Sequence, residues 1–278
     1  MRNTVGGEME KQGIKLGIGF VTGRPNACNI INKYHKKIVE QVKKFHEEVN
    51  ITIFILYDLR YQQAEEADFY KLEPEVYKEI NVKYITPENI EEDKKILKGR
   101  YGFSNKEVNY ILGYGHAKGR NTLMYYALKK KMDYLLFWDD DEYPVACLKG
   151  ENGEVVWKEQ ENIIKHLETI QDADVSIGYH CGYISPIPYF ELNEEIDEIV
   201  LKSYIEAVSN ELVDWETIKN VMKFNNGVTY ANPQIADGEG TYEIGLEKGK
   251  KWVAGSTLCV NLKQIKKMPA FDNPPESR

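Results

Sequence analysis

Short apolar runs alternate along this chain with segments in which apolar residues recur every three or four positions. The runs over residues 15–22 and 51–57 have the length and composition of buried strands, and the second is rich in β-branched residues. Between them, the apolar positions of residues 30–48 fall on one face of a helix, with Lys and Glu on the other. A strand, an amphipathic helix and a second strand make a βαβ unit, so we expect a parallel sheet.

The same patterns continue to the end of the chain. The glycine-rich stretch 99–119 is expected to be a mobile loop that contains one helical turn. The other segments predict, in chain order, a strand over 82–85, a helix over 89–97, a helix over 121–131, a strand over 133–138, a hairpin strand over 154–157, a helix over 163–170, a strand over 174–180, helices near 194–210 and 215–224, and a late strand over 251–262. The predicted fold is one α/β domain with a mostly parallel central sheet flanked by helices.

Composition restricts the function classes. The 278 residues are 42% hydrophobic and 29% charged, which is ordinary for a soluble globular protein. A net charge of -8 argues against a nucleic-acid backbone or an anionic membrane as the main partner. We find neither a signal peptide nor an apolar run approaching the roughly 20 residues of a membrane span, and we expect a cytoplasmic protein without an integral membrane segment. Reduced thiols are expected at four widely spaced positions without a CxxC pair: Cys28, Cys147, Cys181 and Cys259.

Four consecutive acids follow the apolar strand over 133–138. They occupy residues 139–142, with the sequence Asp-Asp-Asp-Glu. Carboxylates at the end of a buried strand repel one another and lose solvation, so a folded domain accommodates them most easily when a divalent cation or another positive group neutralises them. Mg²⁺ and Mn²⁺ choose oxygen ligands and commonly lie between one or two carboxylates and a substrate's phosphates. The alternative interpretation is a solvated acidic turn.

Two other predicted strands also end in polar residues. The first strand is followed by Thr-Gly-Arg-Pro-Asn over 22–26, and the second by Asp-Leu-Arg over 58–60. Ligands of parallel α/β sheets collect outside the carboxyl ends of the strands, so these groups and the acids are expected to converge. The segment 113–121 adds glycines, Lys118, Arg120 and Asn121 at a helix start, where backbone N–H groups and cations can meet a phosphate. A solvated surface loop is the alternative interpretation of this segment.

The order of these features resembles the GT-A nucleotide-sugar glycosyltransferases, especially those of family 2. The resemblance rests on residues 17–26, 56–58, 117–121 and 136–141, and it covers the first half of the chain better than the second. It implies a Rossmann-like domain over 14–278 after a flexible head over 1–13. A nucleotide-binding half would span 14–145 and an acceptor-side half 146–278, and truncation of the second half at its C-terminal end is left open.

The resemblance also implies roles for individual residues. The metal, Mn²⁺ or Mg²⁺, would be bound by Asp141 with Asp139, and Asp139 would also lie near the ribose. Asp58 would lie beside the base. The rest of the predicted nucleotide-sugar site comprises Thr22, Gly23, Arg24, Lys118, Arg120, Asn121 and Asp140. The implied activity is transfer of a sugar from a UDP- or GDP-sugar to a carbohydrate or another acceptor.

The second half departs from the family pattern. Relatives often place an acidic acceptor-activating residue or a third metal ligand there, after a strand of small residues such as that over 255–260. The chain ends soon after that strand, so the catalytic base stays unassigned. Its candidates are Asp237, Glu239, Asp272 and Glu276.

Three other functions stay open at this point. A nucleotidyltransferase or another phosphotransfer enzyme shares the layout of metal and phosphate, but its first strand–helix loop usually has more glycine and basic residues than Gly23 and Arg24 supply. A module that binds nucleotide sugars without turnover is the second alternative. A calcium site over 139–142 is the third, although these contiguous acids lack the alternating ligands of an EF-hand loop.

Overall fold

The computed structural model describes residues 13–61, 64–182, 197–208, 215–225, 227–237, 241, 243–245 and 257–267. Its strands are β1 (Ile14–Thr22), β2 (Val49–Tyr57), β3 (Asn81–Ile85), β4 (Tyr134–Phe137), β5 (Val145–Lys149), β6 (Val155–Glu159), β7 (Val175–Ile177) and β8 (Leu258–Asn261). Its helices are α1 (Asn26–Lys44), α2 (Pro74–Glu79), α3 (Pro87–Tyr101), α4 (Asn105–Ile111), α5 (His116–Lys129), α6 (Asn162–Ile170), α7 (Glu198–Val208), α8 (Trp215–Asn225) and α9 (Pro233–Ala236), with short 3₁₀ helices η1 (Glu66–Tyr70) and η2 (Leu262–Lys267).

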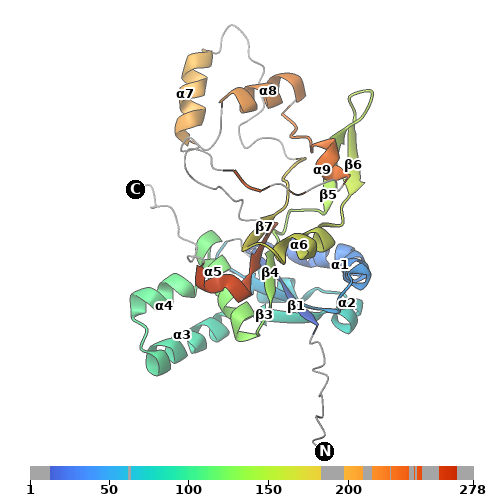
Figure 1. The fold of residues 1–278 in the computed structure, drawn as a ribbon. Coiled ribbons are helices and arrows are strands. Elements are labelled where there is room, and N and C mark those ends of the chain that lie inside the picture. Colours follow the sequence, from blue (N-terminus) through green and yellow to red (C-terminus); the bar gives the residue numbers. More distant parts are fainter. Residues whose placement is uncertain are drawn as a thin grey trace, which may run out of the picture. The chain divides into compact units, whose positions relative to one another are not determined.

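The chain divides into two compact units (Figure 1). The first unit comprises Met1–Tyr143, Asn162–Gly178 and Leu246–Arg278, and the second comprises Pro144–Glu161 and Tyr179–Gly245. The first boundary lies next to the division expected at residue 145. The chain then returns to the first unit twice, first through α6 and β7 and later through β8.

A six-stranded sheet forms the centre of the first unit, in the order β3-β2-β1-β4-β8-β7. The pairs of β1 with β2, β2 with β3, and β1 with β4 are parallel, whereas β8 runs antiparallel to β4 and β7. The predicted mixed α/β fold with a mostly parallel sheet is confirmed at this level. Strands β2 and β3 follow β1 on one side, and β4 lies on its other side, so the strand order reverses between β1 and β4.

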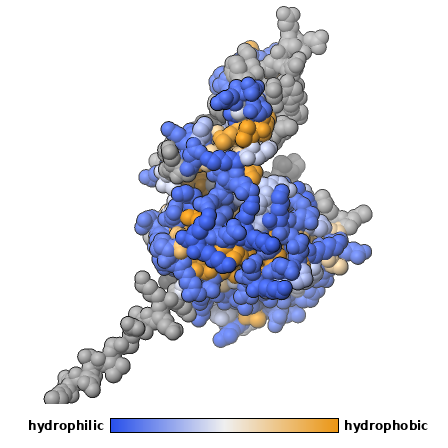
Figure 2. Space-filling view, turned by 90° about the vertical axis from the view of Figure 1, so that its right-hand side faces the viewer, coloured by the Kyte–Doolittle hydropathy of each residue, from blue (hydrophilic) through white to orange (hydrophobic). Residues whose placement is uncertain are grey.

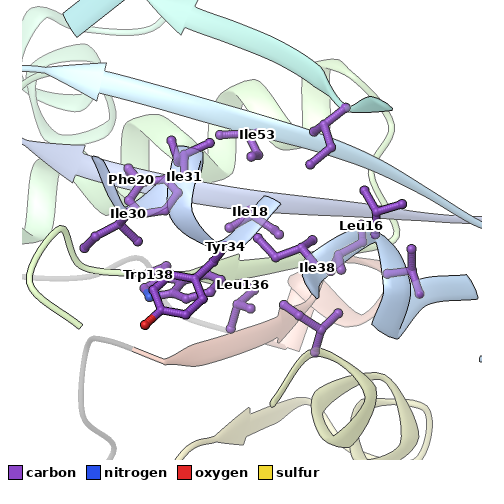
Figure 3. Close-up of a cluster of buried hydrophobic side chains, with 14 of the residues drawn as sticks. Leu16, Ile18, Phe20, Ile30, Ile31, Tyr34, Ile38, Ile53, Leu136 and Trp138 are labelled. Atoms are coloured by element: carbon purple, nitrogen blue, oxygen red, sulfur yellow. The ribbon is translucent and has the colours of Figure 1, made fainter. Parts of the chain in front are cut away.

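One face of the sheet is covered by α1, α2 and α6. Side chains of α1 such as Ile31 and Ile38 pack on Ile18 of β1 and Leu136 of β4, as Figure 3 shows. Ile18, Ile31 and Leu136 are each at most 1% exposed. Full burial of each such side chain stabilises the fold by roughly 1.5–3 kcal/mol. This packing fixes the carboxyl ends of β1 and β4 relative to the helix that follows β1.

The opposite face is covered by α3, α4 and α5. Leu123 and Ala127 of α5 pack with Leu135 and Phe137 of β4 and Phe54 of β2 in a second buried cluster. The period-two burial of β4 explains this division, because Leu136 faces the first cluster and its neighbours face the second. Helix α5 is thereby held over β1 and β4.

The second unit contains an antiparallel hairpin of β5 and β6, with Cys147 paired opposite Trp157. Ala146 of β5 packs with Ala231 and with Ala236 of α9 in one small cluster, and α7 packs on α8 in another. The predicted hairpin strand is confirmed as β6, and the helices predicted near 194–210 and 215–224 are confirmed over 198–208 and 215–225. Residues 194–196 and 209–210 lie outside the described residues.

The surface is largely hydrophilic on the face that Figure 2 shows, with smaller hydrophobic patches between the hydrophilic residues. Within the described ranges, none of the helices has both the length and the apolarity that a membrane crossing requires.

Three sequence-based expectations differ from the structure. The expectation of a mobile loop over 99–119 was wrong. Helix α3 runs on to Tyr101, after which Gly102 ends it in the left-handed conformation (φ 72°). Helix α4 starts at Asn105, and its N-cap residue Ser104 forms a capping box with Glu107. Helix α5 already begins at His116, after Gly115 (φ 91°). Helix α1 begins at Asn26, four residues before the predicted start. Of the late strand, residues 258–261 are confirmed and 251–256 lie outside the described residues.

Candidate functional site

Asp140 links the end of β4 to the end of β1. Its carboxylate accepts hydrogen bonds from the hydroxyl of Thr22, the last residue of β1, and from the guanidinium of Arg24, whose Nε lies 3.2 Å from Oδ2. The hydroxyl of Thr22 in turn accepts the N–H of Arg24 at 2.9 Å. Asp140 is only 3% exposed, so the protein itself supplies the groups that solvate this acid. These bonds join β1 and β4 across the point where the strand order reverses.

Arg24 also reaches Asp141. The terminal nitrogen Nη2 that donates to Asp140 also lies 2.9 Å from Asp141 Oδ2. Hydrogen bonds to Asp140 and then to Asp141 raise the pKa of the Arg24 guanidinium above its ordinary value. Asn26, the first residue of α1, donates from Nδ2 to the carbonyl oxygen of Asp140 at 2.6 Å. The loop after β1 and the acids after β4 therefore form one hydrogen-bonded structure.

Asp139 faces a different arginine. Arg120 of α5 lies with one terminal nitrogen 3.4 Å from Asp139 Oδ1, and its guanidinium lies 5.9 Å from the centre of the Phe137 ring. Burial raises the pKa of the Asp139 carboxyl, Arg120 opposes that rise, and Glu142, Asp141 and Asp140 add to it. Two arginines thus partly neutralise the acidic run.

A tight turn gives the acids alternating orientations. The indole N–H of Trp138 donates to the carbonyl of Glu142 at 3.1 Å, and the N–H of Glu142 donates to the carbonyl of Asp139 at 3.3 Å. The side chains of Asp139 and Asp141 are 36% and 58% exposed. The outer two aspartates are therefore accessible, whereas Asp140 between them is buried.

The fit of a divalent cation to these residues can be judged from that exposure. The described part of the chain contains no group of three or more His, Cys, Asp or Glu side chains placed to hold a metal ion. Mg²⁺ in phosphate-handling enzymes usually keeps several waters and takes only one or two carboxylates, with substrate phosphates as further ligands. Asp139 and Asp141 fit a cation that takes two carboxylates from the protein and its other ligands from phosphates and water.

The start of α5 brings further polar residues to this edge of the sheet. Lys118 and Arg120 lie in its first two turns. Gly119 faces β1, and a Cβ added to it would lie 2.4 Å from a methyl carbon of Val21. Asn121 is buried and donates from Nδ2 to the carbonyl of Tyr110 in α4 at 3.2 Å. Of the residues predicted here, Arg120 contacts the acids and Asn121 contacts α4.

The end of β2 carries an ion pair. Arg60 binds both carboxylate oxygens of Asp58, at 2.8 Å through Nε and 2.9 Å through a terminal nitrogen, and this contact lowers the pKa of the Asp58 carboxyl. The Arg60 guanidinium lies 4.8 Å from the centre of the Tyr114 ring. The N–H of Asp58 donates to the carbonyl of Thr22 at 2.8 Å. Asp58 therefore adjoins the end of β1, as the sequence predicted.

Sequence reasoning did not single out two tyrosines near this ion pair. Tyr61 packs so closely against Gly23 that a Cβ on that glycine would lie 2.3 Å from Tyr61 Cβ. Tyr114 supports Arg60 from the segment before α5. Their positions in the sequence could have indicated them, because Tyr61 directly follows Arg60 and Tyr114 lies between two glycines of the basic segment 113–121.

Among the candidates for a catalytic base, Asp237 is the one that the structure describes. It follows α9 in the second unit and forms an ion pair with Lys158 of β6. Glu239, Asp272 and Glu276 lie outside the described residues.

The chain was compared with protein-family models and with curated proteins, and neither comparison found a match.

Proposed function

We propose that this chain is a metal-dependent glycosyltransferase that moves a sugar from a UDP- or GDP-sugar to an acceptor. The observation that carries the proposal is the pair of accessible carboxylates, Asp139 and Asp141, beside Arg24 and Arg120 where the strand order reverses between β1 and β4. Open α/β sheets bind ligands at such a position, outside the carboxyl ends of the strands. A nucleoside diphosphate with a divalent cation is the ligand class that uses acids and arginines together.

In this proposal Asp139 and Asp141 hold Mn²⁺ or Mg²⁺, and phosphate oxygens and water complete its ligands. The cation, when bound, supplies positive charge to the diphosphate that departs from the sugar. Asp140 was predicted from the sequence to contact the nucleotide sugar. Because it is buried and hydrogen-bonded to Thr22 and Arg24, this proposal instead assigns it to holding the end of β4 in place.

The basic side chains serve the leaving group. Arg24, Lys118 and Arg120 place positive charge beside the donor's phosphates, where negative charge grows as the sugar–phosphate bond breaks. Asp58, held by Arg60, lies at the end of β2 and is assigned to the base of the nucleotide. Gly23 lets the chain after β1 pass close to Tyr61.

The direct test is a donor screen with and without Mn²⁺. We expect one UDP-, GDP- or dTDP-sugar, with Mn²⁺, to raise the melting temperature, because a ligand present at a hundred times its Kd stabilises the native state by about 2.7 kcal/mol. EDTA should abolish the shift. Asp141→Asn should lose the metal-dependent shift while keeping the melting temperature of the free protein. Glu151→Gln, at the exposed turn of the β5–β6 hairpin, removes an equal charge and should keep the shift.

The product identifies the reaction. Release of a nucleoside diphosphate from the donor supports glycosyl transfer or donor hydrolysis. Release of inorganic pyrophosphate from a nucleoside triphosphate supplied with a sugar 1-phosphate would assign the site to nucleotidyl transfer. A metal-dependent shift without either product would reduce the proposal to a binding module. No shift with any donor, or full turnover by Asp141→Asn, would refute it.

A further inference from the structure

Two cysteines that lie 34 positions apart meet in the second unit. The backbone N–H of Cys147, in β5, donates to the sulfur of Cys181 at 3.3 Å. The residue after Cys181 is equally close to β5, since a Cβ built on Gly182 would lie 3.1 Å from Cys147 Cβ. Disulfides join cysteines whose Cβ atoms are about 3.5–4.5 Å apart. The two chain segments are therefore within the reach of a disulfide, although all four cysteines are present as free thiols.

The environments of the two thiols differ. Cys181 is half-buried, whereas Cys147 is fully buried. The thiolate is the reactive form of cysteine, and reaction with an external reagent also requires access to the sulfur. Burial raises the pKa of the Cys147 thiol. A reagent in solvent therefore meets Cys181 first, and Cys147 is placed to react with Cys181.

We propose that Cys181 and Cys147 form a redox-active dithiol, in which Cys181 attacks a small disulfide such as glutathione disulfide and Cys147 resolves the product. The Cys181 thiolate attacks one sulfur of glutathione disulfide, its S–S bond breaks, and one glutathione leaves as a thiolate. Cys147 then loses its proton to solvent and attacks the Cys181 sulfur, and the second glutathione leaves. The two protein thiols lose two electrons and two protons, and one glutathione disulfide becomes two glutathione molecules.

The position of the pair in the chain gives the bond a structural consequence. Between the two cysteines the chain leaves the second unit after Glu161, forms α6 and β7 in the first unit, and re-enters the second unit at Tyr179. A bond between Cys147 and Cys181 closes this excursion into a covalent loop. Because Cys147 belongs to the hairpin and Cys181 follows the re-entry, the bond fastens the returning segment to β5.

Trp157 provides a local reporter of the bond. It pairs opposite Cys147 in the hairpin, and a Cβ on Gly182 would lie 2.5 Å from its ring. The indole therefore packs at the place where the disulfide would form. A change in fluorescence that Trp157→Phe abolishes would report the reaction in the folded protein.

The test is oxidation of the native full-length protein with glutathione disulfide, followed by non-reducing peptide mapping. We expect one cross-link, between Cys147 and Cys181, which dithiothreitol reverses. Cys147→Ser should accumulate a glutathione adduct on Cys181, and Cys181→Ser should form neither adduct nor cross-link. The buried Cys28, whose thiol donates to the carbonyl of Phe69 at 3.2 Å, and the buried Cys259 are internal controls that should react at least about tenfold more slowly than Cys181.

Several outcomes would overturn this proposal. These are adducts on both cysteines without a cross-link, a cross-link that involves Cys28 or Cys259, or reaction of Cys181 no faster than that of Cys28. The wild-type peptide map decides the question even if a serine variant does not fold. The proposal does not depend on sugar transfer, so a protein that oxidises as expected and turns over no donor would refute only the proposed enzyme activity.

Discussion

Neighbouring aspartates after β4 have different physical roles because their side chains point to different surroundings. Asp140 is 3% exposed and hydrogen-bonded to Thr22 and Arg24. The side chain of Asp141 is 58% exposed, and within the described part of the chain its ion pair is with Arg24. Removing one partner of a buried pair leaves the other without a counter-charge, while exposed pairs contribute little to stability. We therefore expect Asp140 to contribute to stability, whereas Asp141 is accessible for the ligand role proposed above.

This difference predicts the effects of matched substitutions. Asp140→Asn should lower the free energy of unfolding by about 1–3 kcal/mol, since Arg24 is itself 39% exposed and water can replace part of the lost bond. Asp141→Asn should change the free energy of unfolding by no more than about 0.5 kcal/mol. Urea unfolding at neutral pH measures both. Equal losses in the two variants would contradict the assignment of roles.

At the scale of elements, the placement of α5 over β1 depends on a missing side chain. Gly119 lies inside the helix, where a glycine destabilises by roughly 1 kcal/mol relative to alanine. Close packing of α5 on β1 offsets this cost, because a Cβ at residue 119 would lie only 2.4 Å and 3.1 Å from the two methyl carbons of Val21. The approach of α5 to β1 is what brings Arg120 to Asp139.

Two glycine-to-alanine variants separate helix propensity from packing. Gly119→Ala should destabilise the protein by about 1–3 kcal/mol, because the added methyl group forces α5 away from Val21. Gly99→Ala, in α3, should stabilise it by up to about 1 kcal/mol, since nothing lies within 4 Å of the added carbon. The measurement is chemical unfolding of both variants beside the wild type. Stabilisation by Gly119→Ala would show that the helix shifts without cost.

The elements that the sequence predicted well are those whose apolar period is set by burial. Strands β1, β2 and β4 and helix α1 bury their regular apolar positions, so their existence followed from the pattern alone. The start of α5 did not, because Gly115 and Gly119 resemble loop residues, and the contact with Val21 that explains Gly119 is tertiary. The capping box of Ser104 and Glu107 was a local signal for α4 that the glycine-rich composition obscured.

The candidate site was predictable to the same extent. Acids after an apolar strand and polar residues after its neighbours predicted that these groups would converge, because parallel strands end at one edge. Arg24 does contact Asp140 and Asp141, and Asp58 adjoins Thr22 at the end of β1. Which aspartate turns inward was not predictable, since the partners of Asp140 lie 116 and 118 positions away. The contact of Cys147 with Cys181 has the same origin in tertiary structure.

At the scale of the whole molecule, one buried histidine connects folding to pH. His166 of α6 is 6% exposed, and its Nδ1 lies 2.8 Å from the hydroxyl oxygen of Ser176 in β7. Burial lowers the pKa of His166 from 6.5 to about 4. The native state therefore keeps this histidine neutral at pH values where the unfolded chain binds a proton.

The sign of the effect follows from proton linkage. Between about pH 6.5 and pH 4 the unfolded state holds more protons at this residue than the native state, so the free energy of unfolding falls as the pH falls. Below about pH 4 both states are protonated and the loss is complete. The difference between 6.5 and about 4 corresponds to a loss of about 3 kcal/mol.

Urea unfolding at intervals from pH 7 to pH 4 tests this dependence. His166→Asn, which retains a polar group near Ser176, should have a shallower loss of stability with falling pH than the wild type, whatever its stability at pH 7. His46→Asn, at a side chain that is 66% exposed, is the matched control and should keep the wild-type slope. The same slope in His166→Asn and the wild type would contradict this prediction, because it would mean that His166 has the same pKa in the folded and unfolded chain. Protonation of His166 between α6 and β7 would then not explain any loss of stability at low pH.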